Sequence, residues 1–337
     1  MKSQRDGNPL VAVVVVGHND KLLVDDCLRS LRGIEHRPLQ PIYVDNESTD
    51  GSLDYLRREF PELIALPSGG NLGYCGGNNV GITRALEQGA EYILVLNPDT
   101  VVHDPRFITT LVDYMRAHPQ VGKTGPKVYL HEVGVVQNTI LDWPSIAGSA
   151  GSLLSWLLGV ARTPKSAAVT VPTEVPSLNG CCLMVRAAAF QDVGLYDAGF
   201  WCYVDEVDWD AQAERAGWAR HYVPVESIVH LQKTSGYDFC SRANYYMKRN
   251  TALWYAKNGK WLSMLVWMTV TTGVACLRLL VSPLRREPVS KHAAFVNRLV
   301  RGYIGVVGDV LGGRLVRRTP VPKMVGVRVA VSSDSSR

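Results

Sequence analysis

The chain has 337 residues, of which 46% are hydrophobic and 20% charged, a composition that argues against intrinsic disorder and allows one large or two modest globular domains. Its seven cysteines are scattered without a C-x-x-C pair, which argues against a disulfide scaffold and predicts small buried residues in a reducing compartment. The amino terminus is too polar for a secretion signal, so we expect a cytoplasmic protein.

The net charge of +5 is unevenly distributed along the chain. Residues 278–328 carry 11 of the 36 Lys/Arg and two of the 31 Asp/Glu, so the rest of the chain carries 25 basic and 29 acidic residues. A basic tail is typical of proteins that bind an anionic membrane or a nucleic acid. Because no RNA-recognition, zinc-finger or clear helix-turn-helix motif accompanies it, we expect an anionic membrane surface and no nucleic acid as partner.

The first hundred residues alternate between strand and helix patterns. Short apolar runs predict strands at 10–16, 41–44, 63–66 and 92–96. Amphipathic or capped segments between them predict helices at 22–32, 52–60 and 78–87. This alternating order predicts an α/β fold with a mostly parallel, Rossmann-like sheet, right-handed crossovers and helices on its faces.

After residue 100 the pattern is less regular. Asp104-Pro105 predicts the start of a helix that ends near Ala117. A less regular region begins at 121–130, and the Gly-, Ser- and Ala-rich segment 143–173 is expected to form a variable loop. Later elements are predicted as strands at 178–185 and 220–223 and a helix at 208–216.

From Asn244 onward the pattern becomes helical and aromatic. Residues 261–281 contain one charge, Arg278, and as a helix would span about 31 Å at about 1.5 Å per residue. Three threonines weaken the case for a membrane-spanning helix, whereas flanking tryptophans and Arg285-Arg286 suit a helix in the membrane interface. We favour the interfacial helix; the alternatives are a spanning helix and a helix packed on the body of the protein.

Three acidic clusters each follow a hydrophobic run, at 43–52, 94–100 and 200–209. In open α/β sheets the carboxyl ends of the strands form the crevice where ligands bind, so we expect the clusters to meet there. Three sets of carboxylates at one crevice predict a site that binds a polyanion through a metal and also contains a base. This combination favours an enzyme that acts on a nucleotide diphosphate.

The second cluster contains the best candidate for a metal ligand. Asn97-Pro98-Asp99 provides a carboxylate at a strand end, in a turn that the proline stiffens, although the same residues would form an ordinary Asx turn. His230 follows another apolar run and would provide a second ligand or a contact to a leaving phosphate. The alternative for this histidine is a place in the core.

The first cluster and the glycine-rich segment after it suggest a nucleotide site. Asp45 and Asn46 leave a strand where a carboxylate would accept hydrogen bonds from a pyrimidine or a ribose, although the surrounding residues are also turn formers. The segment 71–79 opens a helix, so its backbone N–H groups would face an anion. It is not a G-x-G-x-x-G motif, and by itself it is a weak signal.

The third cluster places three carboxylates, those of Asp205, Glu206 and Asp208, within four residues. Like charges this close raise at least one pKa, which suits a general base. The alternative is a solvated acidic start of a helix, which the helix dipole would also favour.

These motifs, in this order, resemble the family-2 glycosyltransferases, which have the GT-A fold. The resemblance covers residues 8–257, about three quarters of the chain. Seven segments carry it: VVVVGHN, YVDNESTDGS, NLGYCGGNNVGI, LVLNPDT, NGCCLMVRAAAF, VGLYDAGFWCYVDEVDW and VHLQKTSG.

The resemblance implies roles for individual residues. Asp99 and His230 would bind Mg²⁺ or Mn²⁺, and Asn97 replaces the first aspartate of the family's D-x-D motif. Glu206 would be the catalytic base, with Asp205 in reserve. The donor-binding residues would be Asn19, Asp45, Asn71, Gly73, Asn79 and Asn97, and the acceptor-binding residues Trp201 and Asp208.

The resemblance also implies an activity. The Q-x-x-R-W motif of the processive synthases is absent, because Gln212 and Arg215 are followed by Ala216, so transfer of a single sugar with inversion is expected. The variants of the motifs are most similar to those of bacterial rhamnosyltransferases, which implies dTDP-L-rhamnose as donor. The acceptor would be a glycan on a polyprenyl diphosphate, used for cell-wall or surface polysaccharide at the cytoplasmic face of the membrane.

The expected organisation has three parts. Residues 1–120 would bind the nucleotide sugar, residues 121–257 would bind the acceptor and carry the base, and residues 258–337 would form a helical, basic, membrane-associated region. Two other functions remain as alternatives, an inactive family member that serves as a membrane-bound scaffold and a nucleotide-dependent oxidoreductase. The first strand ends in GHND and not in a phosphate-binding glycine loop, which disfavours the oxidoreductase.

Overall fold

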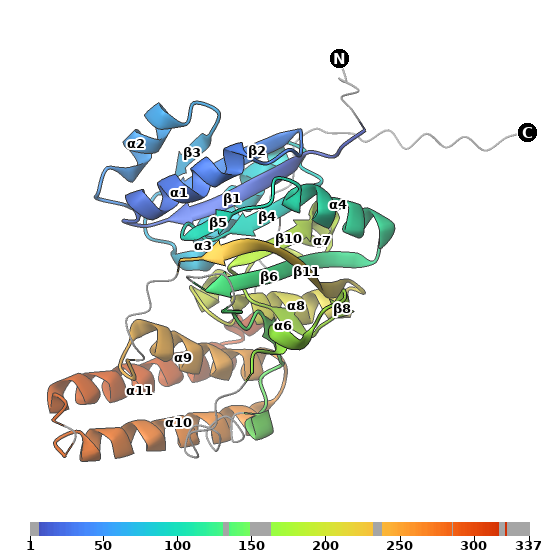
Figure 1. The fold of residues 1–337 in the computed structure, drawn as a ribbon. Helices are drawn as coiled ribbons and strands as arrows, with labels where there is room; N and C mark the ends of the chain where they lie inside the picture. Colours follow the sequence, from blue (N-terminus) through green and yellow to red (C-terminus); the bar gives the residue numbers. More distant parts are fainter. Residues whose placement is uncertain are drawn as a thin grey trace, which may run out of the picture.

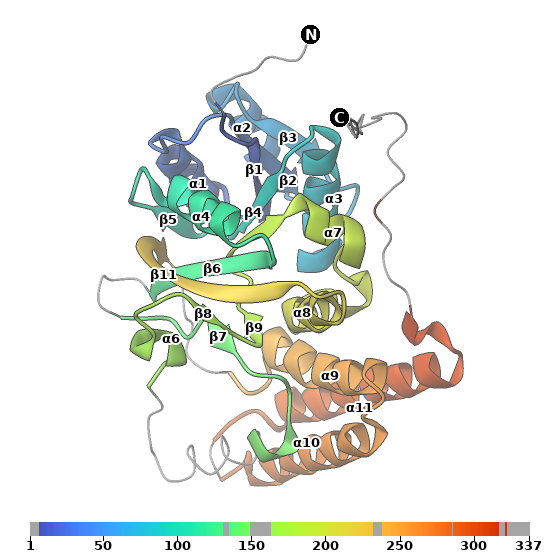
Figure 2. The same ribbon diagram turned by 90° about the vertical axis from the view of Figure 1, so that its right-hand side faces the viewer.

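The structure is a computed structural model that describes residues 7–130, 135–148, 163–231, 238–284, 286–316 and 321. A sheet flanked by helices forms the upper part of the molecule, and three long helices form a lobe beneath it (Figures 1 and 2). The loop predicted at 143–173, the motif that ends at residue 236 and most of the basic tail beyond residue 316 lie partly or wholly outside the described residues.

The amino-terminal half of the sheet is parallel, as predicted. Its strands lie in the order β3 (Ile64–Pro67), β2 (Leu39–Asp45), β1 (Val11–Gly17) and β4 (Tyr92–Leu96). The helices between them in the chain are α1 (Lys21–Arg32), α2 (Ser52–Glu59) and α3 (Gly73–Glu87). Helix α3 begins five residues before the predicted start, because the glycine-rich segment already forms its first turns.

The rest of the sheet is mixed. Strand β10 (Cys182–Arg186) is antiparallel to both β4 and β6 (Val121–Leu130), and β6 is parallel to β11 (Ala219–His230). The short strands β5 (Thr100–Val102) and β8 (Thr173–Glu174) both pair with β11. The remaining strands, β7 (Ile140–Leu141) and β9 (Ser177–Leu178), form a separate pair.

Helices cover both faces of the sheet, which explains why β1 is apolar at almost every position. Ala12 and Val14 belong to the core beneath α3, α7 (Ala187–Val193) and α8 (Asp205–Arg215). The alternate residues Val11, Val13 and Val15 belong to the core beneath α1, α2 and α4 (Phe107–Ala117). The period of two along the strand thus divides its side chains between two cores.

Several predicted elements differ from those of the structure. The irregular region predicted at 121–130 is the continuous strand β6, and β5 was not predicted. The helix expected from Asp104 begins at Phe107, because Asp104 accepts a hydrogen bond from the Arg106 amide in a preceding turn. The strand predicted at 178–185 is divided between β9 and β10 at Asn179-Gly180.

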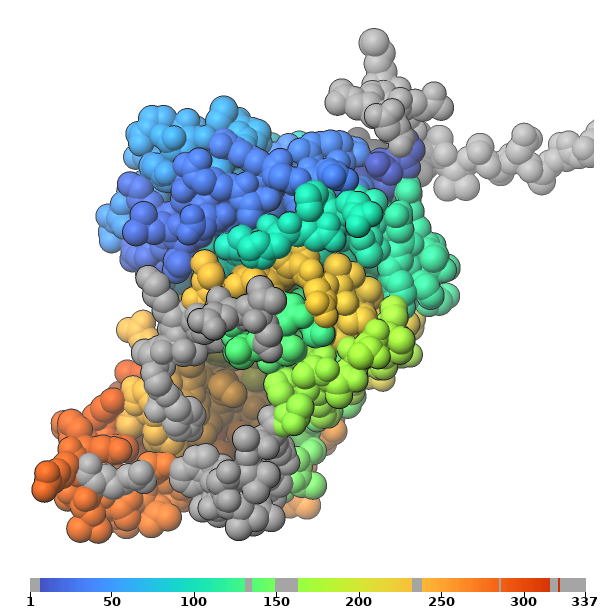
Figure 3. All heavy atoms as spheres, viewed as in Figure 1, coloured from blue at the N-terminus to red at the C-terminus, as the bar shows by residue number. Residues whose placement is uncertain are grey.

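The lower lobe contains α9 (Arg242–Lys257), α10 (Trp261–Val281) and α11 (Val289–Leu311), and short helices lie at α6 (Lys165–Ala168), η1 (Ala198–Phe200) and η2 (Arg314–Val316). Helix α10 has the predicted bounds and is long and apolar enough to cross a membrane, with a mean hydropathy of 1.8 over its most apolar window. Only 17% of that window is buried, so α10 is not an ordinary core helix. In the space-filling view the lobe projects at the lower left, away from the amino-terminal strands (Figure 3).

The buried ion pair between β6 and α8 provides a test of this packing. Lys123 and Asp210 are both fully buried, with Nζ 2.8 Å from Oδ1, and Ser177 also donates to Asp210. We expect Lys123→Met to lower the free energy of unfolding by about 3–5 kcal/mol, because Asp210 is left as a buried charge without its cation. Urea denaturation followed by tryptophan fluorescence measures the change.

Lys127→Met is the matched control in the same strand. Lys127 pairs with Glu226, whose side chain is 58% exposed, so its loss should change the free energy of unfolding by less than about 1 kcal/mol. Equal effects of the two substitutions would contradict a structural role for the buried pair.

Candidate active site

Two of the three acidic clusters, those at 43–52 and 94–100, meet where the first strands end. Gly17 at the end of β1 pairs in register with Asp45 of β2, and β1 also pairs with β4, which ends at Leu96. The loops after these strands enclose a pocket of about 330 Å³. Its lining residues come from four segments of the chain: Val16, Gly17, His18, Asp20, Leu23, Asn46, Tyr74, Asn78, Leu96, Asn97, Pro98 and Asp99. The crevice predicted at the carboxyl ends of the strands is therefore present.

The loops after β1 and β2 are held together by their polar side chains. The amide oxygen of Asn19, a residue in the left-handed region with a φ of 56°, accepts a hydrogen bond of 2.7 Å from the Thr49 N–H. The buried Asp45 accepts one of 3.1 Å from the Ser48 N–H. Both predicted donor-binding residues thus shape the wall beside the pocket.

The glycine-rich segment is connected to the same wall through Asn46. The Asn46 side chain accepts from the Leu72 N–H at 2.9 Å and donates to the Gly73 carbonyl at 3.1 Å. Asn71 caps the Gly73 N–H at 3.1 Å. Gly73 has a φ of 69°, and a Cβ there would collide with Trp201, so a glycine is required at this position.

Asn79 occupies a different place. Its side chain, on the buried face of α3, donates to the Tyr196 carbonyl at 2.8 Å and accepts from the Tyr196 N–H at 3.0 Å. These two bonds fix α3 to the segment that precedes η1. We therefore assign Asn79 to this junction and not to the donor-binding role predicted for it.

The two predicted metal ligands lie next to each other. Antiparallel pairing of β5 with β11 brings His230 Nε2 to 3.0 Å from Asp99 Oδ1 and 3.5 Å from Asn97 Nδ2. The other ring nitrogen, Nδ1, lies 2.8 Å from the Gln137 amide oxygen, an acceptor, so Nδ1 carries the hydrogen of the neutral ring. Nε2 then presents its lone pair towards the Asp99 carboxylate. Because the Nε2 lone pair and Asp99 Oδ1 are both acceptors, a proton or a cation between them would stabilise their close approach.

This donor set fits a divalent cation. Two ligand atoms bound side by side to an octahedral ion at about 2.1 Å lie about 3.0 Å apart, which is the separation of Asp99 Oδ1 and His230 Nε2. Within the described part of the chain, no group of three or more His, Cys, Asp and Glu side chains is arranged to hold a metal. The remaining ligands would therefore come from a substrate or from water.

The third cluster lies at the start of α8, on the other side of the crevice. Glu206 Oε1 accepts a hydrogen bond of 3.3 Å from the Gly180 N–H, and the Gly180 carbonyl accepts one of 2.6 Å from the Tyr74 hydroxyl. The next residue, Cys181, accepts with its carbonyl from the Asn97 N–H at 2.9 Å. The dipeptide Gly180-Cys181 thus connects the predicted base to the predicted metal ligands.

Burial sets the protonation of this cluster. It raises the pKa of the Glu206 carboxyl, and burial together with the neighbouring Glu206 charge raises the pKa of Asp205 well above its usual value. Neither carboxyl oxygen of Asp205 has a hydrogen-bond partner among the described residues. Asp205 thus favours the protonated state and does not share the position of Glu206 beside Gly180.

Asp208 is oriented towards α9. Its Oδ2 accepts from Lys257 Nζ at 2.6 Å and from the Gln212 amide at 2.8 Å, and the same lysine reaches Asp197 at 2.6 Å. These contacts join α8 to α9. We assign Asp208 to this junction and not to the acceptor binding predicted for it.

The loop before α8 is strained and is held by α9. Trp201, Tyr203 and Val204 all have φ values between 64° and 67°, a region that residues with side chains rarely adopt. The fully buried Asn250 donates from Nδ2 to the carbonyls of Phe200, Cys202 and Tyr203, each at 2.8 Å. The predicted acceptor-binding residue Trp201 also stacks on Tyr246 of α9, with ring centroids 4.8 Å apart.

The sequence analysis missed other residues of the crevice. Asp20 lines the pocket with one buried carboxyl oxygen that has no hydrogen-bond partner in the described ranges, and burial raises its pKa to about 6. Its position between His18 and a helix start was a signal that a carboxylate would face the crevice. Tyr74, Gln137 and Asn250 carry no comparable local signal.

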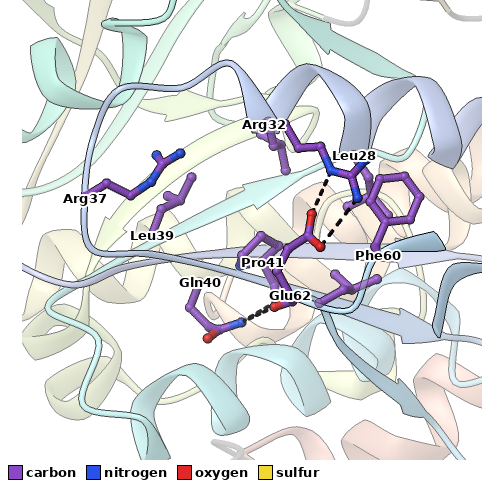
Figure 4. A pocket seen from close by; sticks show the side chains of 10 residues that line it. Leu28, Arg32, Arg37, Leu39, Gln40, Pro41, Phe60 and Glu62 are labelled. Carbon is purple, nitrogen blue, oxygen red and sulfur yellow. Dashed lines mark hydrogen bonds and ion pairs between the residues drawn. The ribbon is translucent and has the colours of Figure 1, made fainter. Parts of the chain in front are cut away.

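Another pocket, of about 320 Å³, lies at the opposite end of β2 (Figure 4). Arg32 crosses it to pair with Glu62 at 2.8 Å and lies 4.4 Å from the Phe60 ring centroid. None of the three acidic clusters contributes to its lining. It therefore does not belong to the site at the crevice.

Comparisons with known proteins agree with this geometry. The family described as "Glycosyl transferase family 2" matches residues 12–194. The chain is 30% identical to N-acetylglucosaminyl-diphospho-decaprenol L-rhamnosyltransferase of Mycobacterium tuberculosis H37Rv, over 77% of this chain and 88% of the relative. It is 24% identical to rhamnosyltransferase WbbL of Escherichia coli K12, over 74% of this chain and 93% of that relative.

Solved structures support the fold. A mannosyltransferase from Pyrobaculum calidifontis, PcManGT, in complex with GDP-Man and Mn²⁺, has a TM-score of 0.52 at 14% identity, over 91% of this chain and 88% of that chain. GalNAc-T7 with UDP, GalNAc and Mn²⁺ has a TM-score of 0.55 at 15% identity, over 76% of this chain and 51% of that chain. The GT-A fold predicted from the sequence is confirmed.

The buried carboxyl of Asp205 predicts a dependence of stability on pH. Because its pKa is raised on folding, the folded protein binds more protons than the unfolded chain from the ordinary Asp range upward, and stability falls as pH rises through this window. Asp205→Asn should remove up to about 1.4 kcal/mol per pH unit from this slope. Urea denaturation at pH values between about 4 and 8 measures the slope.

The exposed Asp26 of α1 provides the control. Asp26→Asn should leave the slope of stability against pH as it is in the wild type. A slope that is the same in Asp205→Asn and the wild type would show that ionisation of Asp205 is not coupled to folding.

Proposed function

Because the chain belongs to glycosyltransferase family 2, we propose that it transfers one sugar from a nucleotide diphosphate to a glycan acceptor on a polyprenyl diphosphate. One observation carries this proposal: the dipeptide Gly180-Cys181 connects Glu206 to Asn97, so a candidate base lies one dipeptide away from the candidate metal ligands at the crevice. A reaction that must activate a hydroxyl and stabilise a leaving diphosphate needs both groups.

We infer that the nucleotide lies in the pocket at the ends of β1, β2 and β4. Asp45 and the loop residues Asn19 and Asn71 stand beside it as hydrogen-bonding groups for the nucleoside. The relatives named as L-rhamnosyltransferases support dTDP-L-rhamnose as the donor. The three-part organisation, 1–120 for the donor, 121–257 for the acceptor and base and 258–337 for the membrane, is proposed on the same grounds, with one sheet shared by the first two parts.

Asp99 and His230, with Asn97 beside them, would hold Mg²⁺ or Mn²⁺. When bound, the cation would neutralise charge that develops on the leaving diphosphate. The Gln137 amide oxygen, 2.8 Å from Nδ1, orients the His230 ring, and Nε2 is the nitrogen that would bind the cation. The Mn²⁺ in two solved structures of the same fold supports this assignment.

Glu206 would accept the proton of the acceptor hydroxyl. The oxygen then forms a bond to the anomeric carbon as the bond to the diphosphate breaks, and a single displacement inverts the configuration. Burial raises the pKa of Glu206, which makes its carboxylate a stronger base, and the Gly180 N–H fixes its position. Trp201 would form an apolar wall for the acceptor saccharide.

Transfer of a single sugar is consistent with the contacts of the Q-x-x-R-A segment. Gln212 donates to Asp208, and Arg215 donates to Asn258, so both side chains have structural partners. The segment stabilises the junction of α8 with α9.

The lower lobe would bind the cytoplasmic face of the membrane. Large apolar side chains are exposed along α10 and α11: Trp261, Leu262, Leu265, Val266, Val270, Leu277, Leu280, Val300, Ile304 and Leu311. A contiguous exposed apolar surface of this size is typical of a membrane or protein contact, and the basic composition of residues 278–328 favours an anionic membrane. Because α10 packs along both α9 and α11, we favour a helix lying in the interface over a spanning helix.

Hydrolysis and transfer assays with a panel of donors test the proposed reaction. We expect Mg²⁺- or Mn²⁺-dependent release of one nucleoside diphosphate from dTDP-rhamnose, UDP-glucose, UDP-galactose, UDP-N-acetylglucosamine or GDP-mannose, with dTDP-rhamnose preferred. Asp99→Ala should reduce the rate at least about 100-fold, because charge on the leaving group loses its stabilisation. Glu206→Gln should reduce transfer by about 100-fold or more while leaving donor binding intact.

Asp113→Ala, at an exposed position of α4, is the control for these carboxylate substitutions and should retain the wild-type rate. Wild-type turnover by Glu206→Gln would rule out the base. Absence of turnover and of donor binding across the panel would favour an inactive scaffold.

Flotation with vesicles of phosphatidylglycerol and phosphatidylcholine tests the membrane contact. We expect the protein to float with these vesicles, and Leu262→Glu combined with Leu280→Glu to abolish flotation, because these side chains are 76% and 75% exposed. Leu22→Glu is the matched control, since Leu22 is 82% exposed on α1, in the upper part of the molecule.

Alkaline carbonate should release the protein from membranes if α10 lies in the interface. Resistance to this extraction would instead indicate a spanning helix, and a wild-type protein that does not float would contradict the membrane contact.

A further inference from the structure

A polar hollow of about 490 Å³ lies between α9 and α11, in the lower lobe and apart from the crevice. Its lining residues are Tyr245, Ala294, Asn297, Arg298, Arg301 and Gly302. Two guanidinium groups one helical turn apart therefore face one concave surface. None of the residues that define the proposed site at the crevice lines this hollow.

No ion pair within the described residues compensates the charge of the hollow. Arg298 and Arg301 are exposed, and neither forms an ion pair or a hydrogen bond with another residue in the described part of the chain. Nearby basic residues differ: Lys291 pairs with Asp238 at 3.0 Å, and Arg314 pairs with Asp309 at 3.1 Å. Two unpaired guanidinium groups this close favour an anion with several oxygens, because arginine binds phosphate oxygens in a bidentate manner.

The shape of the hollow depends on a close contact between the two helices. A Cβ at Gly302 would lie 2.7 Å from the Tyr245 hydroxyl oxygen and 3.0 Å from its ring, so a glycine is needed for the phenol to pack against α11. The Arg298 guanidinium lies 5.9 Å from the centroid of the same ring. Tyr245 thus forms the side of the hollow that belongs to α9 and supports one of the two arginines.

Aromatic rings connect this hollow to the loop in front of the base. Tyr245 packs edge-on against Tyr246 with centroids 5.0 Å apart, and Tyr246 stacks on Trp201 at 4.8 Å. Trp201 lies against Gly73 and belongs to the strained loop, four residues before Asp205 begins α8. Three aromatic rings in contact therefore link the hollow to the loop before α8.

The other side of α11 is apolar. A groove of about 530 Å³ between α10 and α11 is lined by Met268, Thr269, Thr272, Val300, Tyr303, Ile304 and Val307. Ile304 follows Arg301 by three positions, so the two side chains are neighbours on the helix surface. The arginines therefore flank the surface that would contact lipid, at the depth where phosphate groups meet hydrocarbon.

We propose that Arg298 and Arg301 bind the diphosphate of a lipid-linked acceptor. Its hydrocarbon chain lies along the apolar surface of α10 and α11, and its saccharide extends past Tyr246 towards Trp201 and Glu206. This assignment rests on the proposed transfer to a lipid-linked acceptor and adds the group that the protein recognises in it. It also gives α11 a function beyond membrane attachment.

Binding of farnesyl diphosphate to the purified protein tests the assignment without any need for turnover. Quenching of tryptophan fluorescence measures the dissociation constant for the wild type, Arg298→Ala/Arg301→Ala and Arg314→Ala. We expect the double variant to bind at least about 10-fold more weakly, because each charge-assisted contact typically contributes that factor or more. Arg314→Ala and the wild type should bind alike, and all three proteins should have the same Tm.

Several outcomes would overturn the proposal. One is equal affinity in the wild type and the double variant, or no binding of farnesyl diphosphate by the wild type. Equal affinity for farnesol and farnesyl diphosphate would remove the role of the charge. Displacement of farnesyl diphosphate by a nucleoside diphosphate with Mn²⁺ would place it in the donor pocket instead.

Vesicle flotation separates the acceptor from an ordinary phospholipid headgroup. The double variant should still float with phosphatidylglycerol vesicles, since the apolar surface is intact. Loss of flotation with unchanged binding of farnesyl diphosphate would assign the arginines to phospholipid and overturn the proposal. The donor assays test the transferase proposal separately. Their outcome does not alter the result of the farnesyl diphosphate binding experiment.

Discussion

The burial of four carboxylates in the first two turns of α8 is the constraint on which the rest of the structure depends. They belong to Asp205, Glu206, Asp208 and Asp210. A buried carboxylate costs several kcal/mol unless a cation or N–H groups compensate it, so each must find a partner or keep a proton. Asp210 pairs with Lys123 of the sheet, and Asp208 pairs with Lys257 of α9. These two ion pairs fix the helix from opposite sides and leave the first two carboxyls without a cation as partner in the described residues.

The need for either a partner or a proton explains why Glu206 and Asp205 differ in protonation although they are adjacent. Glu206 receives the Gly180 N–H, whereas Asp205 has no partner among the described residues and lies beside a like charge. Protonation is therefore favoured more strongly at Asp205 than at Glu206. Unequal protonation of two adjacent carboxyls is a recurring way to obtain one base from a pair.

The sequence predicts the helices and strands whose conformation is determined by their own residues. Strands β1 and β4 are continuous apolar runs, and α10 is a largely apolar helix, so their bounds follow from local composition. Strand β6 contains Lys123, Gly125 and Pro126, which locally favour a loop. Its lysine is buried because Asp210, 87 residues later, neutralises it, and its proline lies where the register with β11 shifts.

The residues of the site also differ in this respect: some are predictable from their neighbours in the sequence, and others only from contacts with distant segments. Asp99 and His230 are 131 residues apart, yet both follow apolar runs, so their meeting at a strand end was predictable. Asn250 and Tyr246 were not, since an amide or a phenol in an amphipathic helix is usually an ordinary surface or core residue. Their importance appears only when the loop that they contact is known to be strained.

That loop makes the crevice dependent on the lower lobe. Three residues in rarely populated backbone regions cost about 1–3 kcal/mol each. The two N–H groups of Asn250 Nδ2, shared among three carbonyls, and the stacking of Trp201 on Tyr246 contribute about 1 kcal/mol each, which offsets part of that cost. The loop therefore keeps its conformation only while α9 is in place. Because α9 also packs against α10 and α11, the packing of the lower lobe determines the conformation of the loop that precedes Glu206.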